Sequence, residues 1–281
     1  MEFITITQLN KAQHLLKTTP SAAHFEKIIK QDTTLVYNGN PIAVYLTLPR
    51  EAVTELRRVA QGTQYKSSDR TWGLPTQSTV FGALPRHPAR NDYCRFTNSS
   101  RTEPAHLETS FKFAQVINDI YKKYLPVAQE FNNRAIDEAI HKDWRINETP
   151  FTTCNFNINH AIKYHQDRGN FKDVFSNVLI LRSGITGGEL VFPEFGLAFE
   201  QQDCALGIFD GQHWVHGVMP ITRQRKNAYR ASIVFYALAG MKSCYPYKEE
   251  IERFKTVRTK QEKERSIGNP ELRRQTKNRS N

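Results

Sequence analysis

The stretch that decides the fold is FTTCNFNINHAIKYHQDRGNF, residues 151–171. Thr152–Ile158 has the composition of a β-strand, and it leads to the triplet His165-Gln166-Asp167. In an extended strand, residues i and i+2 point to the same side. His165 and Asp167 would then present an imidazole and a carboxylate together, two thirds of the set of two histidines and one carboxylate that binds iron(II). Alone, this triplet is weak evidence, because such pairs also occur on ordinary surfaces.

A second histidine downstream can complete the set. His216 lies 49 residues after Asp167, in IFDGQHWVHGV, residues 208–218. An apolar run precedes it and Gly217 follows it, which leaves room for a small cosubstrate. His213 is the competing candidate, three residues earlier, and the flanking glycine favours His216.

An arginine begins the last apolar run, YRASIVFYAL, residues 229–238. If the Arg230 head is buried it needs an anionic partner, and its planar fork suits a carboxylate. The distal carboxylate of 2-oxoglutarate would be that partner, with the Ser232 hydroxyl on the same face. The chain between His216 and Arg230 is short enough for a hairpin to bring the two together. A surface arginine at a strand start is the alternative.

Five strand-like runs follow the deciding segment, and Gly and Pro residues separate them: Val178–Arg182, Glu189–Val191, Leu197–Glu200, Ala205–Phe209 and Arg230–Leu238. Several short strands at such spacing indicate a β-sandwich or barrel. Upstream, residues 108–142 repeat apolar side chains at three- and four-residue spacing around Pro126, which predicts two helices supporting the core. Thr33–Tyr37 and Ile42–Leu48 are predicted strands, and Arg50–Gln61 is a predicted helix.

Together, H-x-D, a distant H-G and R-x-S match the order of the double-stranded β-helix dioxygenases, with iron(II), 2-oxoglutarate and O2 as cofactors. We therefore expect an α+β fold with a jelly-roll core and supporting helices. Residues 1–107 are predicted to be an N-terminal α/β segment and Arg-rich loop packing on that core. Residues 108–247 would hold the support helices and the core, and residues 248–281 a basic, flexible tail in which Lys248–Arg265 could form a solvated helix. Within the first part, residues 62–108 show little regular pattern.

The composition is basic, with 39 Lys and Arg against 28 Asp and Glu, a formal charge of +11. Such an excess favours a polyanion, nucleic acid first, as partner, and we expect its contacts from residues 62–101 and 248–281. The four cysteines form no C-x-x-C pair and are expected to be reduced thiols. With neither a secretory signal nor an 18-residue apolar run, the expectation is a soluble intracellular monomer without membrane contact, in a nucleus or a bacterial or phage-infected cytoplasm.

The chain resembles the oxygenase domain of the TET/JBP family, closer to its JBP-like and microbial or viral branch. The resemblance rests on FTTCNFNINHAIKYHQDRGNF, on GGELVFPEFGLAFE (187–200), on IFDGQHWVHGV leading to YRASIVFY, and on the upstream ARNDYCRFTNSSRTEP (89–104). It implies iron at His165, Asp167 and His216, 2-oxoglutarate at Arg230, and hydroxylation of the 5-methyl group of 5-methylcytosine or thymine in DNA. The four scattered cysteines cannot supply the zinc-binding region of the animal TET enzymes.

Other residues are weaker candidates. Asn155 is expected to help Arg230 and Ser232 bind the cosubstrate. Asn155 and Asn157, on the same face of the strand, could equally bind the base or form hydrogen bonds within the sheet. Possible substrate or DNA contacts are Asn157, Arg168, Asn170, Trp214, Arg90 and Arg95. Trp214 could instead be core, and Asp210 could orient a ligand histidine.

A methyl group on a stacked base cannot reach a buried metal, so the pyrimidine would have to be flipped out or single-stranded. Three alternatives remain open from the sequence. They are a 2-oxoglutarate-dependent hydroxylase of a protein side chain or small molecule, a demethylase that removes N-linked alkyl groups from bases, and a catalytically silent DNA-binding module.

Overall fold

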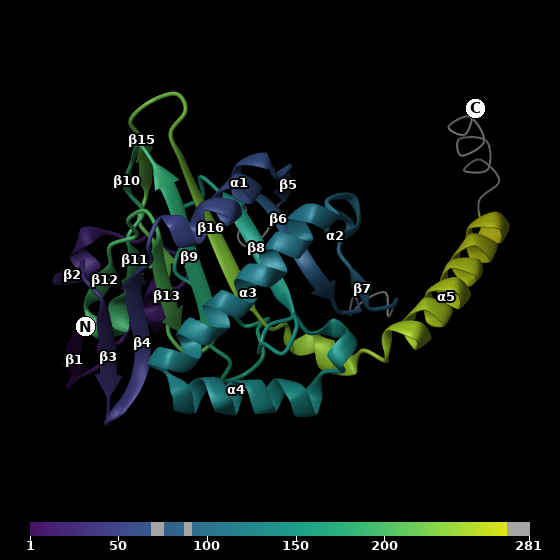
Figure 1. The fold of residues 1–281 in the computed structure, drawn as a ribbon, viewed down its shortest axis with the longest axis horizontal. Coiled ribbons are helices and arrows are strands. Elements are labelled where there is room, and N and C mark those ends of the chain that lie inside the picture. The colour runs from purple at the N-terminus through teal and green to yellow at the C-terminus, as the bar shows by residue number, and fades with distance from the viewer. Residues whose placement is uncertain (69–75, 87–91, 269–281) are drawn as a thin grey trace.

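The computed structural model describes residues 1–68, 76–86 and 92–268 (Figure 1). Its largest element is a ten-stranded mixed sheet in the order β1-β3-β4-β13-β9-β16-β8-β6-β5, with β7 paired to β6. Neighbouring strands run antiparallel except β1 and β3. The strands are β1 Glu2–Ile6, β3 Thr33–Tyr37, β4 Asn40–Thr47, β5 Lys66–Ser68, β6 Thr76–Leu84, β7 Arg95–Phe96, β8 Thr153–Ile158, β9 Ser176–Ser183, β13 Ala205–Phe209 and β16 Tyr229–Tyr236.

A second, smaller sheet faces the first. It has the order β14-β11-β12-β2, and a separate pair joins β10 to β15. Buried aromatic side chains of both sheets, such as Tyr45, Phe209 and Phe199, form one apolar cluster between them. The strands are β2 Lys27–Ile29, β10 Ile185–Gly187, β11 Leu190–Phe192, β12 Leu197–Phe199, β14 Gly217–Val218 and β15 Ile221–Arg223. Two facing sheets with helices outside them confirm the α+β expectation.

Helices cover the opposite face of the large sheet, where α3 crosses the strands and α4 runs below it (Figure 1). Phe113 and Ile117 of α3 pack with Phe156 and Phe235 of the sheet in a buried cluster. Pro126 begins the second support helix, as the sequence predicts. The helices are α1 Thr54–Gly62, α2 Asn98–Thr102, α3 Pro104–Tyr124, α4 Pro126–Ala139 and α5 Tyr247–Gly268.

Strand β16 shows how the two sides of the large sheet differ. Ala231, Ile233 and Phe235 point into the cluster under the helices. The alternating residues Arg230, Ser232, Val234 and Tyr236 line a pocket on the other side. This is the period-two alternation of a strand with both faces covered, and it puts the polar residues of β16 between the two sheets.

One expectation needs correction. Residues 62–108 are not irregular throughout, because Thr76–Leu84 forms a nine-residue strand inside the large sheet. The N-terminal strands β1, β3 and β4 are part of that same sheet. The segment after the core is helical over Tyr247–Gly268, where the sequence allowed a solvated helix.

The cysteines also differ from expectation. Cys94 and Cys244 form a disulfide, with an S–S distance of 2.03 Å, while Cys154 and Cys204 are free and buried. The two bonded residues are 150 positions apart, so the sequence held no local pattern that would pair them.

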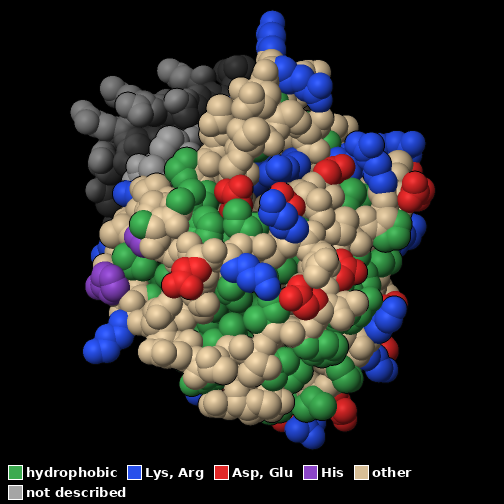
Figure 2. Space-filling model, turned by 90° about the vertical axis from the view of Figure 1, so that its left-hand side faces the viewer, with side chains coloured by type: hydrophobic (Ala, Val, Ile, Leu, Met, Phe, Trp, Pro, Cys, Tyr) green, Lys and Arg blue, Asp and Glu red, His purple; other side chains and the backbone are tan. Residues whose placement is uncertain are grey.

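The surface turned to the viewer in Figure 2 is the left-hand side of Figure 1, where β1 and β2 lie. Basic and acidic side chains are interspersed there, with hydrophobic side chains between them. The positive charge of the chain is therefore not gathered on this face. None of the described helices is long and apolar enough to cross a membrane.

Candidate metal centre and cosubstrate pocket

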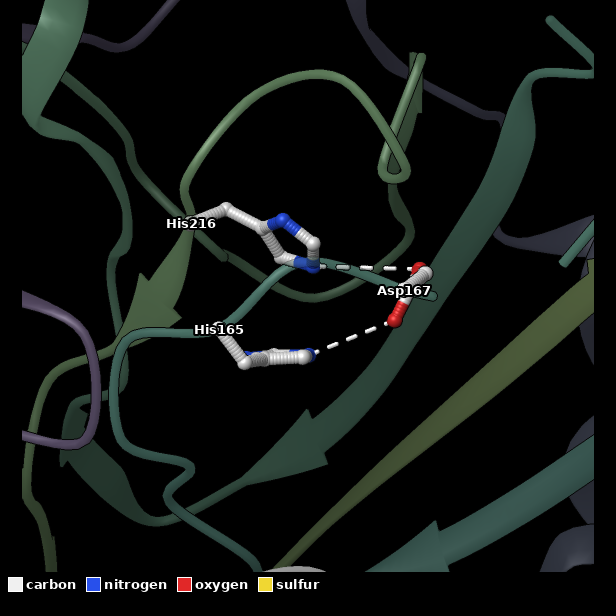
Figure 3. A group of neighbouring side chains, drawn as sticks. All are labelled: His165, Asp167 and His216. Atoms are coloured by element: carbon white, nitrogen blue, oxygen red, sulfur yellow. Dashed lines mark ion pairs between the residues drawn. The ribbon is translucent and has the colours of Figure 1, made fainter. Parts of the chain in front are cut away.

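His165, Asp167 and His216 converge on one point at the pocket (Figure 3). Their ligand atoms all lie within 4.8 Å of one another. Nε2 of His165 is 3.4 Å from Oδ1 of Asp167, and Nε2 of His216 is 3.9 Å from Oδ2 of the same carboxylate. Two imidazoles and one carboxylate at this spacing, open to a pocket on the remaining side, fit iron(II) with free coordination positions.

The backbone brings the two histidines together through a single antiparallel bridge. The N–H of His165 donates to the carbonyl of His216 at 2.9 Å, and the N–H of His216 returns the bond at 3.0 Å. The H-x-D triplet therefore does not lie in a regular strand, although its side chains converge as the strand argument predicted. Arg230 is not joined to His216 by a hairpin either, since it belongs to the large sheet, across the pocket.

The outer nitrogens of both imidazoles are held by the protein. Nδ1 of His165 donates to the Lys163 carbonyl at 2.9 Å, and Nδ1 of His216 donates to the Trp214 carbonyl at 3.0 Å. Both bonds leave Nε2 as the ligand atom, a tautomer choice that partners of this kind enforce. Burial and the neighbouring His165 lower the pKa of His216 to about 4, so its ring is neutral and able to coordinate.

Asp167 is fixed from several directions. Its Oδ2 accepts from the Asn170 amide at 3.3 Å and from the Ser176 hydroxyl at 3.4 Å, and its N–H donates to the Gly211 carbonyl at 2.8 Å. A Cβ on Gly211 would lie 2.5 Å from Oδ2, so only glycine fits there. Burial opposes ionisation, but His165 and His216 outweigh it and hold the pKa of Asp167 below its usual value.

Arg230 is 2% exposed, and its Nε has no hydrogen-bond partner among the described residues. Among the described residues its side chain makes one hydrogen bond, a long one from Nη1 to the His160 carbonyl at 3.4 Å. Burial and the nearby Arg182 lower the pKa of Arg230 to about 10, which leaves the group charged at neutral pH. The charge of Glu189 acts on Arg230 from a distance, but among the described residues no carboxylate forms an ion pair with it. A buried cation without such contact is costly, so this site fits a carboxylate ligand such as the distal group of 2-oxoglutarate.

Amide and hydroxyl groups lie beside Arg230 on the same wall. Asn157 donates to the Ser232 hydroxyl at 3.4 Å, and Asn155 donates to Asn157 at 3.2 Å. Oδ1 of Asn155 is buried without a partner. All three residues line the pocket, where an unsatisfied acceptor favours a ligand that donates a hydrogen bond.

The pocket has a volume of about 880 Å³, within the range of small-molecule sites. Lys17 and Arg168 are exposed at its edge. Besides Asp167, the charged residues that line it are all basic. The pocket therefore joins a metal site, a buried arginine and a basic rim.

Four of the weaker candidates do not take the positions expected of them. Trp214 is buried against Phe195, at a ring distance of 4.7 Å, and is core rather than a base-stacking platform. Asp210 accepts from the N–H groups of Gln212 and His213, both at 3.1 Å, so it caps a turn and does not orient a ligand histidine.

Asn170 is buried, and its side-chain amide donates hydrogen bonds to Asp167 and Ser176. It therefore supports the metal ligand rather than contacting DNA. Arg95 is engaged with Asp92 and the Tyr93 carbonyl and is not among the pocket residues. Arg90 lies outside the described residues. The competing His213 is exposed and does not join the metal cluster.

Several pocket residues were not predicted. Lys17 comes from the N-terminal segment, whose backbone pairs with Tyr164 beside the metal ligands. His160 and Gln201 also line the pocket. Lys17 and Gln201 lie outside the quoted motifs, and His160 lies within the stretch 151–171 without a characteristic spacing of its own, so only the folded chain reveals their position.

Comparison with known proteins agrees with this geometry. Residues 85–239 match the Tet_JBP family model, described as the oxygenase domain of the 2OGFeDO superfamily. The thymine dioxygenase JBP1 of Trypanosoma brucei brucei is 26% identical over 176 residues, 62% of this chain and 20% of that protein. JBP1 of Leishmania major is 24% identical over 227 residues, 77% of this chain and 27% of that protein. The chain thus spans about a fifth to a quarter of these relatives.

A solved structure, NgTET1 in complex with 5mC DNA, has a TM-score of 0.60 and 15% sequence identity, covering 91% of this chain and 90% of that one. At this identity the likeness concerns the fold, and it supports the jelly-roll core. The family model covers more than half of the chain, including all three ligands and Arg230. The chain therefore belongs to the TET/JBP family of iron(II)- and 2-oxoglutarate-dependent oxygenases.

Proposed function

We propose that this protein hydroxylates the 5-methyl group of a pyrimidine in DNA, thymine or 5-methylcytosine. The products would be a 5-hydroxymethyl base, succinate and CO2. The observation that carries the proposal is one pocket that holds the triad of His165, Asp167 and His216 together with the buried Arg230, which forms no ion pair with the described residues. Bound iron(II) and 2-oxoglutarate would activate oxygen for attack on a C–H bond.

The chain's own residues would hold and enclose the reactants. His165, Asp167 and His216 would bind the metal, and Arg230 with Ser232 and Asn155 would hold the cosubstrate. The pocket lies between two sheets, and a substrate that fills its mouth would exclude water from the reacting groups. Asn157 faces the same space and could contact the base.

A DNA substrate is supported by charge and by the relatives. The chain carries a net charge of +11, and the exposed Lys17 and Arg168 lie at the rim, where phosphates beside the target would pass. The relatives named thymine dioxygenase favour thymine as the first substrate to test. The pyrimidine would enter flipped out of the duplex or from single-stranded DNA. We expect a monomer, in whichever compartment holds that DNA.

The test is incubation with iron(II), 2-oxoglutarate and DNA that contains either 5-methylcytosine or thymine alone, followed by mass spectrometry of nucleosides. We expect a 5-hydroxymethyl nucleoside with wild type and with His213→Ala, and none with His216→Ala. Comparing single-stranded with duplex substrate separates the two modes of entry. Succinate release with a peptide or small molecule, and no modified base, would contradict the DNA proposal and favour a different hydroxylase.

A further inference from the structure

Gln201 is a buried amide at the pocket that the proposed roles leave unused. It lies in the turn between β12 and β13, is 1% exposed, and lines the pocket. Neither Nε2 nor Oε1 has a hydrogen-bond partner among the described residues. Burying an amide without partners costs free energy, so this side chain is suited to a ligand that supplies the missing bonds.

The turn that carries Gln201 borders the Arg230 end of the pocket. In this turn the Cys204 N–H donates to the Ile180 carbonyl at 2.8 Å, and the Asp203 carboxylate accepts from the Arg182 N–H at 2.9 Å. Ile180 pairs with Ser232 and Arg182 pairs with Arg230 in the β9–β16 ladder. Gln201 therefore lines the pocket from a turn that packs beside Ser232 and Arg230.

The turn that carries Gln201 is anchored on both sides. The Tyr45 hydroxyl donates to the Glu200 carbonyl at 2.5 Å, and the Gln202 amide donates to the Thr47 hydroxyl at 2.7 Å. Both partners belong to β4 of the large sheet. The backbone on either side of the unpartnered amide is therefore held in place, as a binding residue requires.

We propose that Gln201 binds the distal carboxylate of 2-oxoglutarate together with Arg230. A carboxylate offers about four lone-pair sites; the arginine fork takes two of them, and Nε2 of Gln201 would donate to a third. Oε1 of Gln201 needs a hydrogen-bond donor. The Arg230 guanidinium has five N–H groups, and those not used by the carboxylate or the His160 carbonyl could donate to it. The inference rests on the proposed role of Arg230.

The experiment measures binding of 2-oxoglutarate by calorimetry to full-length protein loaded with Mn(II), which takes the place of iron(II) without turnover. Gln201→Leu should raise the Kd of 2-oxoglutarate about 10- to 100-fold, the loss of a hydrogen bond to a charged group. The Kd of Mn(II) and the affinity for DNA should not change. Gln201→Asn keeps the amide group on a side chain shorter by one methylene, and it should also raise the Kd of 2-oxoglutarate. This variant tests the inference if Gln201→Leu does not fold.

Asn177→Leu is the matched control. Asn177 is another fully buried amide with an unpartnered oxygen, but it is not among the pocket residues. It should change the Tm without changing the Kd of 2-oxoglutarate. Wild-type binding by both Gln201 variants would overturn the inference.

Arg230→Met separates this failure from a failure of the proposed site. If Arg230→Met loses binding while the Gln201 variants keep it, only the role of Gln201 falls. If Arg230→Met also binds normally, the cosubstrate does not use this end of the pocket, and the proposed site falls as well.

Discussion

The two charged side chains at the centre of the pocket, the partly buried Asp167 and the buried Arg230, are held in opposite ways. Asp167 has hydrogen-bond donors around it and two histidines that stabilise its negative charge. Arg230 has one long bond to a carbonyl and an unpartnered Nε. The protein thus supplies hydrogen-bond partners for the metal ligand Asp167 before any metal binds. It leaves the Arg230 guanidinium with hydrogen-bond donors that the described residues do not use. A carboxylate bound there would recover the stability that burial of the cation costs.

Glu194 gives a stability prediction at the same scale. Its Oε1 accepts from the Val215 N–H at 3.2 Å, its Oε2 has no hydrogen-bond partner within the described part of the chain, and burial raises its pKa to about 7. The ordinary value is 4.5, so between pH 4.5 and 7 the folded state holds a proton that the unfolded state releases. Stability therefore falls as the pH rises through this window.

Glu194→Gln removes the ionisation and keeps the accepting oxygen. The variant should match wild type near pH 4.5 and exceed it by roughly 1–3 kcal/mol above pH 7. Denaturant unfolding at pH 5 and pH 8 measures the difference, with the exposed Glu148→Gln as control. A difference that is the same at both pH values would show that Glu194 does not titrate in this way.

Among the elements, those with a strong periodic signal were predictable. Thr33–Tyr37 and Ala205–Phe209 have the predicted bounds, and the helix pair breaks at Pro126. The short strands β11 and β12 were also predicted to within one residue at each end, whereas β14 and β2 carry too little pattern to be recognised. Their partners, far away in the sequence, fix them instead.

The site residues also differ in how far the sequence pattern could predict them. The H-x-D triplet, His216 and Arg230 could be predicted because their spacing is characteristic. Trp214 and Asp210 could not be assigned, because an aromatic or acidic residue near a metal ligand can equally be core or cap a turn. Only the packing around each side chain distinguishes these possibilities.

The Cys94–Cys244 disulfide joins two elements that also meet through Glu250. That buried carboxylate accepts from the Cys94 N–H at 2.9 Å and the Tyr245 N–H at 3.0 Å, and it pairs with Arg86. The bridge fixes the segment before β7 to the segment before α5. Because it closes a loop of 150 residues, its effect on the unfolded chain is large.

Reduction of this disulfide should cost about 2–5 kcal/mol of unfolding free energy. We expect a reductant to lower the Tm of the wild type. The double variant Cys94→Ser/Cys244→Ser should have this lowered Tm both with and without the reductant. Thermal unfolding with and without a phosphine reductant makes the comparison. If the double variant responds to the reductant as wild type does, the effect arises from another source.

At the scale of the whole molecule, the pocket and the strongest basic segment are separate features. Helix α5 leaves the body and projects beyond β7 (Figure 1). Its first turns are anchored, since Glu250 is buried, Arg253 donates to the Asp92 carbonyl at 2.8 Å, and the Phe254 ring lies 4.7 Å from that of Tyr93. These anchoring contacts all lie in the first turns of the helix.

Residues 257–281 hold eight Lys or Arg and three Glu, a net charge of +5 out of the total of +11. A cut after Thr256 removes this charge and keeps Glu250, Arg253 and Phe254, whereas a cut at Tyr247 would also remove those contacts. Because affinity for DNA depends on phosphate neutralisation, the shortened protein should bind DNA about tenfold or more weakly, with a smaller slope of log Kd against log salt. Its affinity for 2-oxoglutarate should not change, because the pocket is intact.

Titration of labelled DNA at several salt concentrations measures the slope. An unchanged slope would mean that the DNA contacts lie elsewhere. The pocket rim at Lys17 and Arg168 would then be the next region to test.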